Sequence, residues 1–275
     1  MADSTVNHEK YRVAPTGDFS LASIDPGETQ GFDKVKANKL AKKNRERLSE
    51  WQERLYAEGK RSVLLVLQAM DTGGKDSTIR EVMKGVNPQG CHVFGFKAPT
   101  HQELARDFLW RIHDRVPPKG FIGIFNRSHY EDVLIVRVHG WAPAEVLEAR
   151  YDHINAFERL LTDNGTRIVK VMLHISKAYQ LERLRRRLER PDKWWKFNPG
   201  DLKERALWDE YMHCYELALQ RCSTEKAPWY VVPAEHQWFR NLVITQLLAD
   251  TLEGMHPEYP EPDFNPEDYP PENLI

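Results

Sequence analysis

Five short, continuous apolar runs constrain the fold of this chain more than any other feature. They lie at residues 63–67, 93–96, 121–125, 168–175 and 229–232. Runs of this length without polar alternation are typical of strands buried on both faces. Helical patterns precede, separate and follow them, at 33–60, 78–84, 101–113, 144–163, 177–190, 201–221 and 238–252. Strands that alternate with helices predict an α/β fold, in which helices cover both faces of a parallel sheet.

The chain of 275 residues is expected to form a single domain over residues 33–252. Residues 1–32 mix Gly, Pro, Ser and Asp, which predicts an N-terminal arm. Residues 253–275 hold six prolines and seven acidic residues, and neither Lys nor Arg. Such a segment buries little apolar surface, so we expect an acidic, proline-rich tail that wraps over the surface or is disordered.

Several classes of protein are excluded by composition. The three cysteines are widely spaced and match no disulfide or metal-binding pattern, which favours a reducing cytoplasm. The first ten residues are polar and do not resemble a signal peptide. No apolar run approaches the roughly 20 residues that span a bilayer, so no membrane association is expected. The net charge of −2 says nothing about partners.

A phosphate-binding loop is predicted directly after the first apolar run. The turn 71–74 is followed by Lys75 and a helix, so backbone N–H groups and a lysine can hold phosphate oxygens. The general pattern is matched imperfectly, because Ala69 replaces its first glycine and Asp76 follows the lysine. An ordinary strand-to-helix turn is the alternative. The residues expected to hold phosphate are Gly73, Gly74, Lys75, Asp76, Ser77 and Thr78.

A second polar cluster follows the run at 121–125. In phosphate-loop folds the strand beside the first one ends in an acid that helps hold Mg²⁺. Asn126 occupies that position here, and Glu131 and Asp132 come shortly after it. Carboxylates suit Mg²⁺, with Mn²⁺ as an alternative. The expected metal ligands are therefore Asp71, Asn126, Glu131 and Asp132. An exposed turn at a strand end is the alternative, which is disfavoured because ligands bind at the carboxyl ends of parallel strands.

Arginines and lysines gather between residues 182 and 196. For a charge run alone, a solvated helix face is the simplest interpretation. In a phosphate-transfer enzyme the segment suits a lid, at about 177–201, that closes over the transferring phosphates. Together with a basic helix at 34–47, it suits a long polyanion better than one nucleotide. The cations expected to bind phosphate there are Lys97, Arg183, Arg187, Lys193 and Lys196.

Several motifs together resemble the family-2 polyphosphate kinases, which move phosphate between inorganic polyphosphate and nucleotides. The resemblance covers roughly residues 30–252 and rests on 67–76, 96–100, 108–111, 125–134, 173–177, 195–197 with Asp201, and 227–229. It implies a fold like that of thymidylate kinase, with a five-stranded parallel sheet and a helical lid. It also implies dependence on Mg²⁺, with Lys75, Arg127 and the lid arginines gripping polyphosphate.

Residues 126–131, Asn-Arg-Ser-His-Tyr-Glu, look like the subgroup that phosphorylates both AMP and ADP. The expected reaction is therefore direct in-line transfer between polyphosphate and adenine nucleotides, with guanine nucleotides as further acceptors. Asp71, Lys75, Arg127 and Arg187 are the expected catalytic residues. For His129 we expect a structural role, because a nucleotide phosphate oxygen needs no strong general base. Because the side chain of Asn126 is neutral, it could bind the metal through its carbonyl oxygen or only position a water.

Two other functions are compatible with parts of the sequence. One is an ATP-dependent kinase of a small metabolite on the same fold, which would not need so many cations outside the loop. The other is a polyanion or nucleic-acid binder, suggested by the basic segments. The near-neutral charge and the acids at 71, 131 and 132 argue against it, so nucleic acid is not an expected partner. A homo-oligomer, dimer or tetramer, is expected.

Overall fold

A computed structural model describes residues 5–15 and 17–271 and contains a five-stranded parallel sheet. The strand order is β2-β3-β1-β4-β5, and every neighbouring pair is parallel. The strands are β1 (Ser62–Gln68), β2 (Cys91–Gly95), β3 (Ile122–Asn126), β4 (Thr166–His174) and β5 (Trp229–Pro233). All five apolar runs are thus strands, and the predicted α/β fold is confirmed.

The register of the central strands brings their carboxyl ends to one edge. Leu67 near the end of β1 lies opposite Asn126, the last residue of β3. β1 is buried along its whole length, because strands flank it on both sides and helices cover both faces. The loop after β1 and the polar cluster after β3 therefore meet at the same edge, where ligands bind in open α/β sheets.

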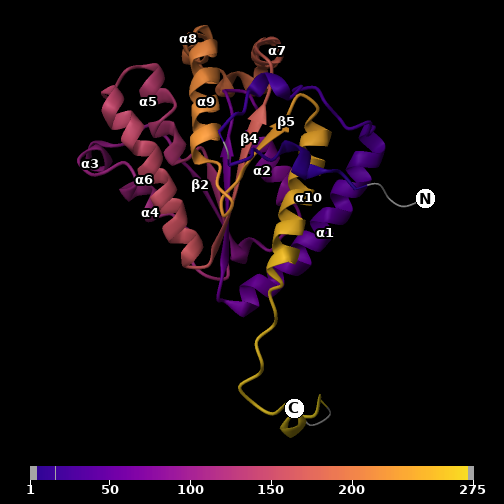
Figure 1. The fold of residues 1–275 in the computed structure, drawn as a ribbon. Coiled ribbons are helices and arrows are strands. Elements are labelled where there is room, and N and C mark those ends of the chain that lie inside the picture. The colour runs from indigo at the N-terminus through magenta and orange to yellow at the C-terminus, as the bar shows by residue number, and fades with distance from the viewer. Residues whose placement is uncertain (1–4, 16, 272–275) are drawn as a thin grey trace.

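Helices form a layer on each side of the sheet (Figure 1). α1 packs along α10, which also contacts α2, and α6 packs against α9 and β4 on the other side. The longer helices are α1 (Lys34–Glu58), α2 (Lys75–Val82), α6 (Ala144–Asp163), α7 (Lys177–Leu188), α9 (Trp208–Cys222) and α10 (Gln237–Met255). The shorter ones are α3 (His101–Leu104), α4 (Trp110–His113), α5 (Ile135–Val138) and α8 (Gly200–Ala206).

Two predicted helices are each divided in the structure. The pattern at 101–113 forms α3 and α4, because Asp107 Oδ1 accepts a hydrogen bond from the Leu109 N–H and closes a local turn between them. The pattern at 201–221 forms α8 and α9, which are separated where Leu207 has φ −93° and ψ 28°. α2 begins at Lys75 rather than at Thr78, so the predicted phosphate loop leads straight into its first turn.

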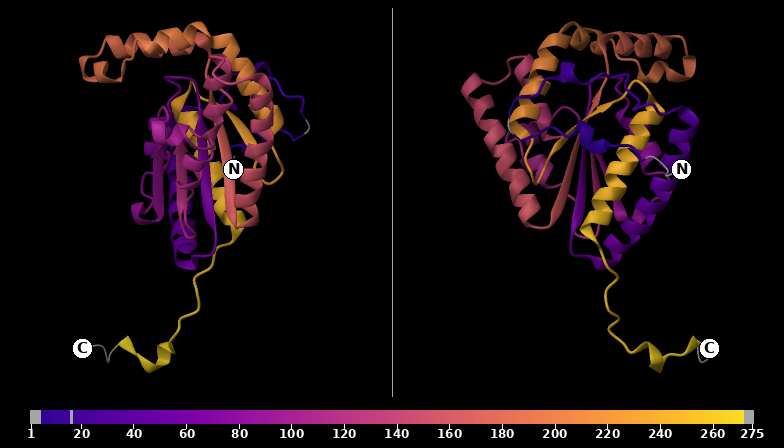
Figure 2. Two further views of the ribbon diagram at one scale, coloured as in Figure 1. Left: turned by 90° about the vertical axis from the view of Figure 1, so that its left-hand side faces the viewer. Right: turned by 45° about the vertical axis from the view of Figure 1, so that its right-hand side comes forward.

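The segment from α7 to α8 stands apart from the body of the protein. It comprises α7, the 3-10 helix η5 (Pro191–Lys196) and α8. Figure 2 shows it as an arm above the carboxyl edge of the sheet, projecting beyond the helical layers. We call this segment the lid arm, because it contains the predicted lid at 177–201.

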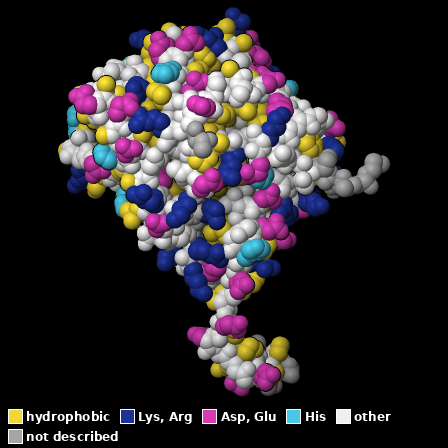
Figure 3. Space-filling view, in the orientation of Figure 1, with side chains coloured by type: hydrophobic (Ala, Val, Ile, Leu, Met, Phe, Trp, Pro, Cys, Tyr) yellow, Lys and Arg dark blue, Asp and Glu magenta, His cyan; other side chains and the backbone are white. Residues whose placement is uncertain are grey.

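The two ends of the chain behave differently. The predicted N-terminal arm lies against the body, where the Val13 N–H donates to Trp229 O at 2.8 Å and Tyr11 and Val13 are buried. After Tyr259, whose ring still contacts Arg54, the chain leaves the body as an exposed tail that carries acidic side chains and neither Lys nor Arg (Figure 3). Within the described residues, the search for a helix both long and apolar enough to cross a bilayer finds none.

A buried polar network supports the polar segment that follows β3. Lys170, on β4, is fully buried and donates to Glu158 Oε2 at 2.5 Å, Tyr130 Oη at 2.9 Å and Cys222 O at 2.6 Å. His129 and Tyr130 also contact Glu158 Oε1, at 3.2 and 2.8 Å. Although burial favours a neutral carboxyl, Lys170 and His129 lower the pKa of Glu158. The network thus holds a buried carboxylate with its cation.

Lys170→Met is expected to lower the free energy of unfolding by about 3–5 kcal/mol, because it leaves the buried Glu158 carboxylate without its cation. Denaturant unfolding measures this loss. The double variant Lys170→Met/Glu158→Leu should recover part of the stability, since both buried charges are then removed. A single variant as stable as the parent would contradict the assigned ion pair.

Candidate functional site

The turn between β1 and α2 requires glycine at two positions. A Cβ on Gly73 would lie 2.7 Å from the Ala69 Cβ and 2.9 Å from Met70 O. Gly74 has φ +100°, and a Cβ there would overlap a guanidinium nitrogen of Arg240. The small side chain of Ala69 packs against Gly73, which explains how alanine replaces the first glycine of the general pattern. The backbone thus forms a tight loop that aims the N-terminus of α2 at the sheet edge.

Lys75 reaches back across this loop. Its Nζ donates to Ala69 O at 2.8 Å. Burial lowers the pKa of Lys75, and the neighbouring charge of Arg127 lowers it further. Asp71, Glu131 and Asp76 act in the opposite direction and favour the charged form. The lysine is therefore a partly desolvated cation, which interacts strongly with any anion that enters the loop.

Asp71 and Arg127 join the two predicted motifs. Arg127 Nη2 donates to Asp71 Oδ1 at 2.8 Å, so the loop after β1 is tied to the end of β3. Arg127 has φ +65°, a conformation that few non-glycine residues adopt. Its N–H donates to Leu67 O at 3.1 Å, which holds the unusual backbone in place. Burial opposes its charge, but Glu131 and Asp71 outweigh this effect and raise the pKa of Arg127.

Asn126 adds a second link between the same motifs. Its Nδ2 donates to Asp76 Oδ1 at 2.7 Å. The amide therefore acts as a donor toward a carboxylate of the phosphate loop. An acid at this position would repel Asp76, so asparagine and Asp76 form a matched pair. This contact gives Asn126 a role in joining the motifs that the sequence did not predict.

Most of the predicted phosphate-binding residues line one large cavity of about 630 Å³ between the loop and the lid arm. We call it the basic cavity, because nine cationic side chains and only three carboxylates line it. The cations are Lys75, Arg80, Arg127, Arg183, Arg186, Arg187, Arg190, Lys193 and Lys196; the carboxylates are Asp71, Asp76 and Glu189. Gly73, Gly74 and Ser77 of the loop also line it. The predicted lid cations are thus brought to the predicted phosphate loop.

A second cavity, of about 210 Å³, lies on the other side of Asp71 and Arg127. We call it the mixed pocket, because carboxylates, tyrosines and aliphatic side chains line it and Arg127 is its one cation among the lining residues. The lining side chains include Met70, Asp71, Arg127, Glu131, Leu134, Ile135, Asp201, Glu204, Tyr211 and Tyr215. Asp71 and Arg127 line both cavities and so form their common border.

The base of the lid arm is bonded to the phosphate loop. Gln180 is buried in α7, and its Nε2 donates to Asp71 O at 3.1 Å. Arg205 of α8 donates to Gln180 Oε1 at 3.1 Å. Further out, Arg187 Nη1 donates to Lys196 O at 2.9 Å and to Asp201 Oδ2 at 3.2 Å, which fixes α7 against α8. A movement of the arm would therefore be transmitted directly to Asp71.

Three predicted site residues lie away from the two cavities. Thr78 is buried, and both its N–H and its hydroxyl donate to Gly74 O, so no donor is left for phosphate. Lys97 is exposed beyond both cavities, on the segment after β2. Asp132 faces α6, where Arg150 Nη1 lies 3.7 Å from its Oδ1 and 2.7 Å from its carbonyl oxygen. The structure therefore does not bring these three residues together with the others, and their roles stay predictions.

The predicted metal ligands are only partly brought together. Within the described residues, no group of three or more His, Cys, Asp or Glu side chains is arranged to hold a metal ion. Asp71 and Glu131 both line the mixed pocket, whereas Asn126 is bonded to Asp76 and Asp132 is turned away. Mg²⁺ in phosphate-transfer sites needs only one or two carboxylates, because phosphates and waters complete its shell. Asp71, with Glu131 nearby, therefore fits such an ion.

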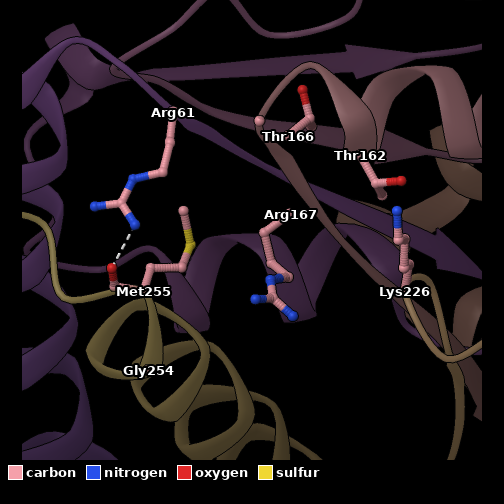
Figure 4. A pocket seen from close by; sticks show the side chains of 8 residues that line it. Arg61, Thr162, Thr166, Arg167, Lys226, Gly254 and Met255 are labelled. Atoms are coloured by element: carbon pink, nitrogen blue, oxygen red, sulfur yellow. Dashed lines mark hydrogen bonds between the residues drawn. The ribbon is translucent and has the colours of Figure 1, made fainter.

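A third cavity, of about 330 Å³, lies at the opposite, amino end of β1 and β4 (Figure 4). Arg61, Arg167 and Lys226 surround it. Arg61 donates to Met255 O at 2.5 Å and pairs with Glu58, and Lys226 pairs with Asp163 at 2.6 Å. Two of its three cations are thus already neutralised, which makes it a poorer anion site than the basic cavity.

Sequence reasoning missed several residues of the site. Glu204, Arg205, Tyr211 and Tyr215 reach it from the helical pattern at 201–221, which the sequence did not connect with the loop. Gln180 lies within the predicted lid, but its bond to the loop was not predicted. Arg240 also reaches it, from α10, where it is buried beneath Gly74. The one available signal was an arginine next to the apolar residues 242–244 of this helix, because buried charges usually have a specific role.

Burial raises the pKa of Asp132 to about 6, although Arg150 acts in the opposite direction. The raised pKa means that the folded state binds a proton at Asp132 more tightly than the unfolded state does. This proton stabilises the fold below about pH 4, and the stabilisation is lost as the pH rises through 6. Asp132→Asn does not ionise and should be more stable than the parent above pH 6, by at most about 3 kcal/mol. Urea unfolding at pH 5 and pH 8 measures this difference, and a less stable variant at pH 8 would contradict it.

Comparison with known proteins agrees with this geometry. Residues 31–260 match the family model for polyphosphate kinase 2 (PPK2). An AMP/ADP-polyphosphate phosphotransferase of Meiothermus ruber is 55% identical over 93% of this chain and 96% of that protein. An ADP-polyphosphate phosphotransferase of Rhodopseudomonas palustris is 47% identical over 78% and 79%. The crystal structure of polyphosphate kinase 2 from Arthrobacter aurescens TC1 superposes with a TM-score of 0.91 at 48% identity, covering 95% and 96% of the chains. The chain therefore belongs to the polyphosphate kinase 2 family.

Proposed function

We propose that this enzyme transfers a phosphoryl group between inorganic polyphosphate and the adenine nucleotides AMP and ADP. The observation that carries the proposal is the pair of chemically different cavities that share Asp71 and Arg127. A transferring group at this border would be within reach of a ligand in either cavity. The name of the relative in Meiothermus ruber supports polyphosphate with both AMP and ADP, and the name of that in Rhodopseudomonas palustris supports polyphosphate with ADP.

The basic cavity suits the polyphosphate chain. Polyphosphate carries about one negative charge per phosphate along its length, so it requires many cations in a row. The lid arm supplies arginines and lysines from α7 and η5, and the loop supplies Lys75 and backbone N–H groups. Long-range attraction between these groups and the chain is strong inside a cavity with few acids. An ATP-dependent kinase of a small metabolite would have no use for cations this far from the loop.

The mixed pocket suits the nucleoside of AMP or ADP. Tyr211 and Tyr215 offer ring faces, and Leu134 and Ile135 offer apolar surface for a base. The carboxylate of Glu204 can accept hydrogen bonds from ribose hydroxyls. Glu204 is itself oriented by Tyr211 Oη at 2.6 Å and His139 Nε2 at 3.0 Å. The nucleotide phosphate then points toward Asp71 and Arg127.

The transfer itself is proposed to be direct and in line. The attacking nucleotide oxygen is already ionised at neutral pH, so no general base is needed. Lys75 and the loop N–H groups hold the donor phosphates, while Arg127 neutralises charge on the transferring group. Arg187 acts from the lid arm, where Asp201 holds its guanidinium. His129 is buried against Glu158 and therefore plays a structural part.

A divalent ion, Mg²⁺ or Mn²⁺, is part of this proposal. Asp71, helped by Glu131, would hold it, and it would supply charge neutralisation for the phosphates. A homo-oligomer and a cytoplasmic location remain predictions from the sequence. Guanine nucleotides are proposed as additional acceptors, because stacking on a tyrosine ring such as that of Tyr211 or Tyr215 does not distinguish one purine from another.

The parent enzyme is expected to form ADP and then ATP from AMP, Mg²⁺ and polyphosphate, with no ATP present. Chromatographic separation of the nucleotides checks this. Lys75→Ala should reduce turnover by roughly 100-fold or more, which is the usual effect of removing a group that stabilises charge in the transition state of an enzyme. Asp71→Asn should abolish most of the turnover. Lys97→Ala serves as the matched control, because Lys97 lies outside both cavities. No product from the parent enzyme, or normal turnover by Lys75→Ala, would sink the proposal.

Arg183→Ala tests the assignment of substrates to cavities. Arg183 lines the basic cavity and is not among the residues of the mixed pocket. The KM for polyphosphate should rise several-fold, because a cation facing the chain is lost, while the KM for AMP stays within about twofold. Steady-state kinetics with each substrate varied in turn measure both values. A rise confined to the KM for AMP would reverse the assignment.

A further inference from the structure

Arg240 is a buried cation placed directly beneath the phosphate loop. It lies in the first turn of α10, and its side chain is 1% exposed. One guanidinium nitrogen, Nη1, occupies the space that a Cβ on Gly74 would need. Another, Nη2, lies 3.3 Å from Ser77 Oγ. The guanidinium therefore supports the turn from Gly74 to Ser77 from inside the protein.

No carboxylate of the described residues lies within ion-pair distance of this guanidinium. Its remaining hydrogen bonds go to a neutral oxygen, Asn241 Oδ1, at 3.2 Å from Nε and 2.9 Å from Nη2. Nη1, which faces the loop, has no hydrogen-bond acceptor within the described part of the chain. Burial lowers the pKa of Arg240 to about 10, and the positive charge of Arg183 adds to this effect, whereas Tyr179 and the more distant Glu81 act in the opposite direction. A buried charge that contacts no carboxylate is costly, so its retention calls for an anion nearby.

The surroundings of Arg240 show which substrate supplies that anion. Gly74 and Ser77, its two neighbours in the loop, line the basic cavity, as do Gln237 one turn earlier in α10 and Arg183 of α7. None of these four residues is among those that line the mixed pocket. The charge of Arg240 thus lies behind the wall of the basic cavity and away from the proposed nucleotide site.

We propose that Arg240 is a positioning residue for the polyphosphate donor: it supports the Gly74–Ser77 turn, and a phosphate bound on the other side of that turn is its counterion. This inference rests on the proposed function, because it takes polyphosphate as the ligand of the basic cavity. A phosphate held by the N–H groups of the turn and the guanidinium behind them attract each other across a thin layer of backbone.

The test compares Arg240→Met, which removes the charge, with Arg240→Lys, which keeps it. For Arg240→Met we expect the KM for polyphosphate to rise about tenfold or more, while the KM for AMP stays within about twofold. Arg240→Lys should recover a large part of the loss. Arg167→Met is the control, because it removes one cation at the opposite end of the sheet (Figure 4) and should leave both values unchanged.

Thermal unfolding separates this role from a merely structural one. Without ligand, the Tm of Arg240→Met should equal or exceed that of the parent, because an uncompensated buried charge has been removed. Added polyphosphate should raise the Tm of the parent more than that of the variant. An unchanged KM for polyphosphate, or a parallel rise in both KM values together with a lower Tm, would overturn the proposal.

Two further measurements keep the test decisive. If Arg240→Met does not fold, Arg240→Gln removes the charge but keeps a polar side chain; it should raise the KM for polyphosphate and spare that for AMP, and the opposite pattern would refute the inference. If the parent enzyme does not turn over polyphosphate at all, the proposed function fails. The thermal shifts with polyphosphate still decide whether Arg240 supports anion binding.

Discussion

The ion pair between Arg127 and Asp71, 2.8 Å long, is the contact on which the rest of the site depends. It joins the loop after β1 to the segment after β3 and stands at the border of both cavities. Its geometry requires the unusual backbone of Arg127, which the hydrogen bond to Leu67 O and the buried network around Lys170 hold in place. The register of the sheet and the buried network around Lys170 therefore both hold this ion pair, and with it the site, in place.

Charge is distributed unequally around this ion pair. On one side the lid arm and the loop present cations to the basic cavity, and on the other side carboxylates and tyrosines line the mixed pocket. In the proposed function, a long polyanion and a nucleoside meet different chemistry within one site, and each substrate has its own place. The lid arm takes part in both cavities, because Arg187 and Asp201 line different ones and are bonded to each other. The arm therefore links the two proposed binding events.

The sequence predicted the sheet, the phosphate loop and the basic lid segment because each depends on local pattern. Apolar runs and the Asp71–Lys75 turn are readable residue by residue, and the family resemblance added the roles of Arg127 and Arg187. The positions of Thr78, Lys97 and Asp132 were not predictable in this way, since neighbouring residues in a motif can face opposite directions. Arg240 reaches the loop from a distant helix through tertiary packing, which no local pattern contains, and the bond from Gln180 of the predicted lid depends on the same packing.

The central claim is that polyphosphate and nucleotide occupy opposite sides of the border formed by Asp71 and Arg127. A crystal structure of the slowed Asp71→Asn variant with AMP and polyphosphate tests it most directly. We expect a phosphate chain running from the loop along α7 in the basic cavity, with adenine beside Tyr211 and Tyr215 in the mixed pocket. Both ligands in one cavity, or adenine among the lid arginines, would contradict it.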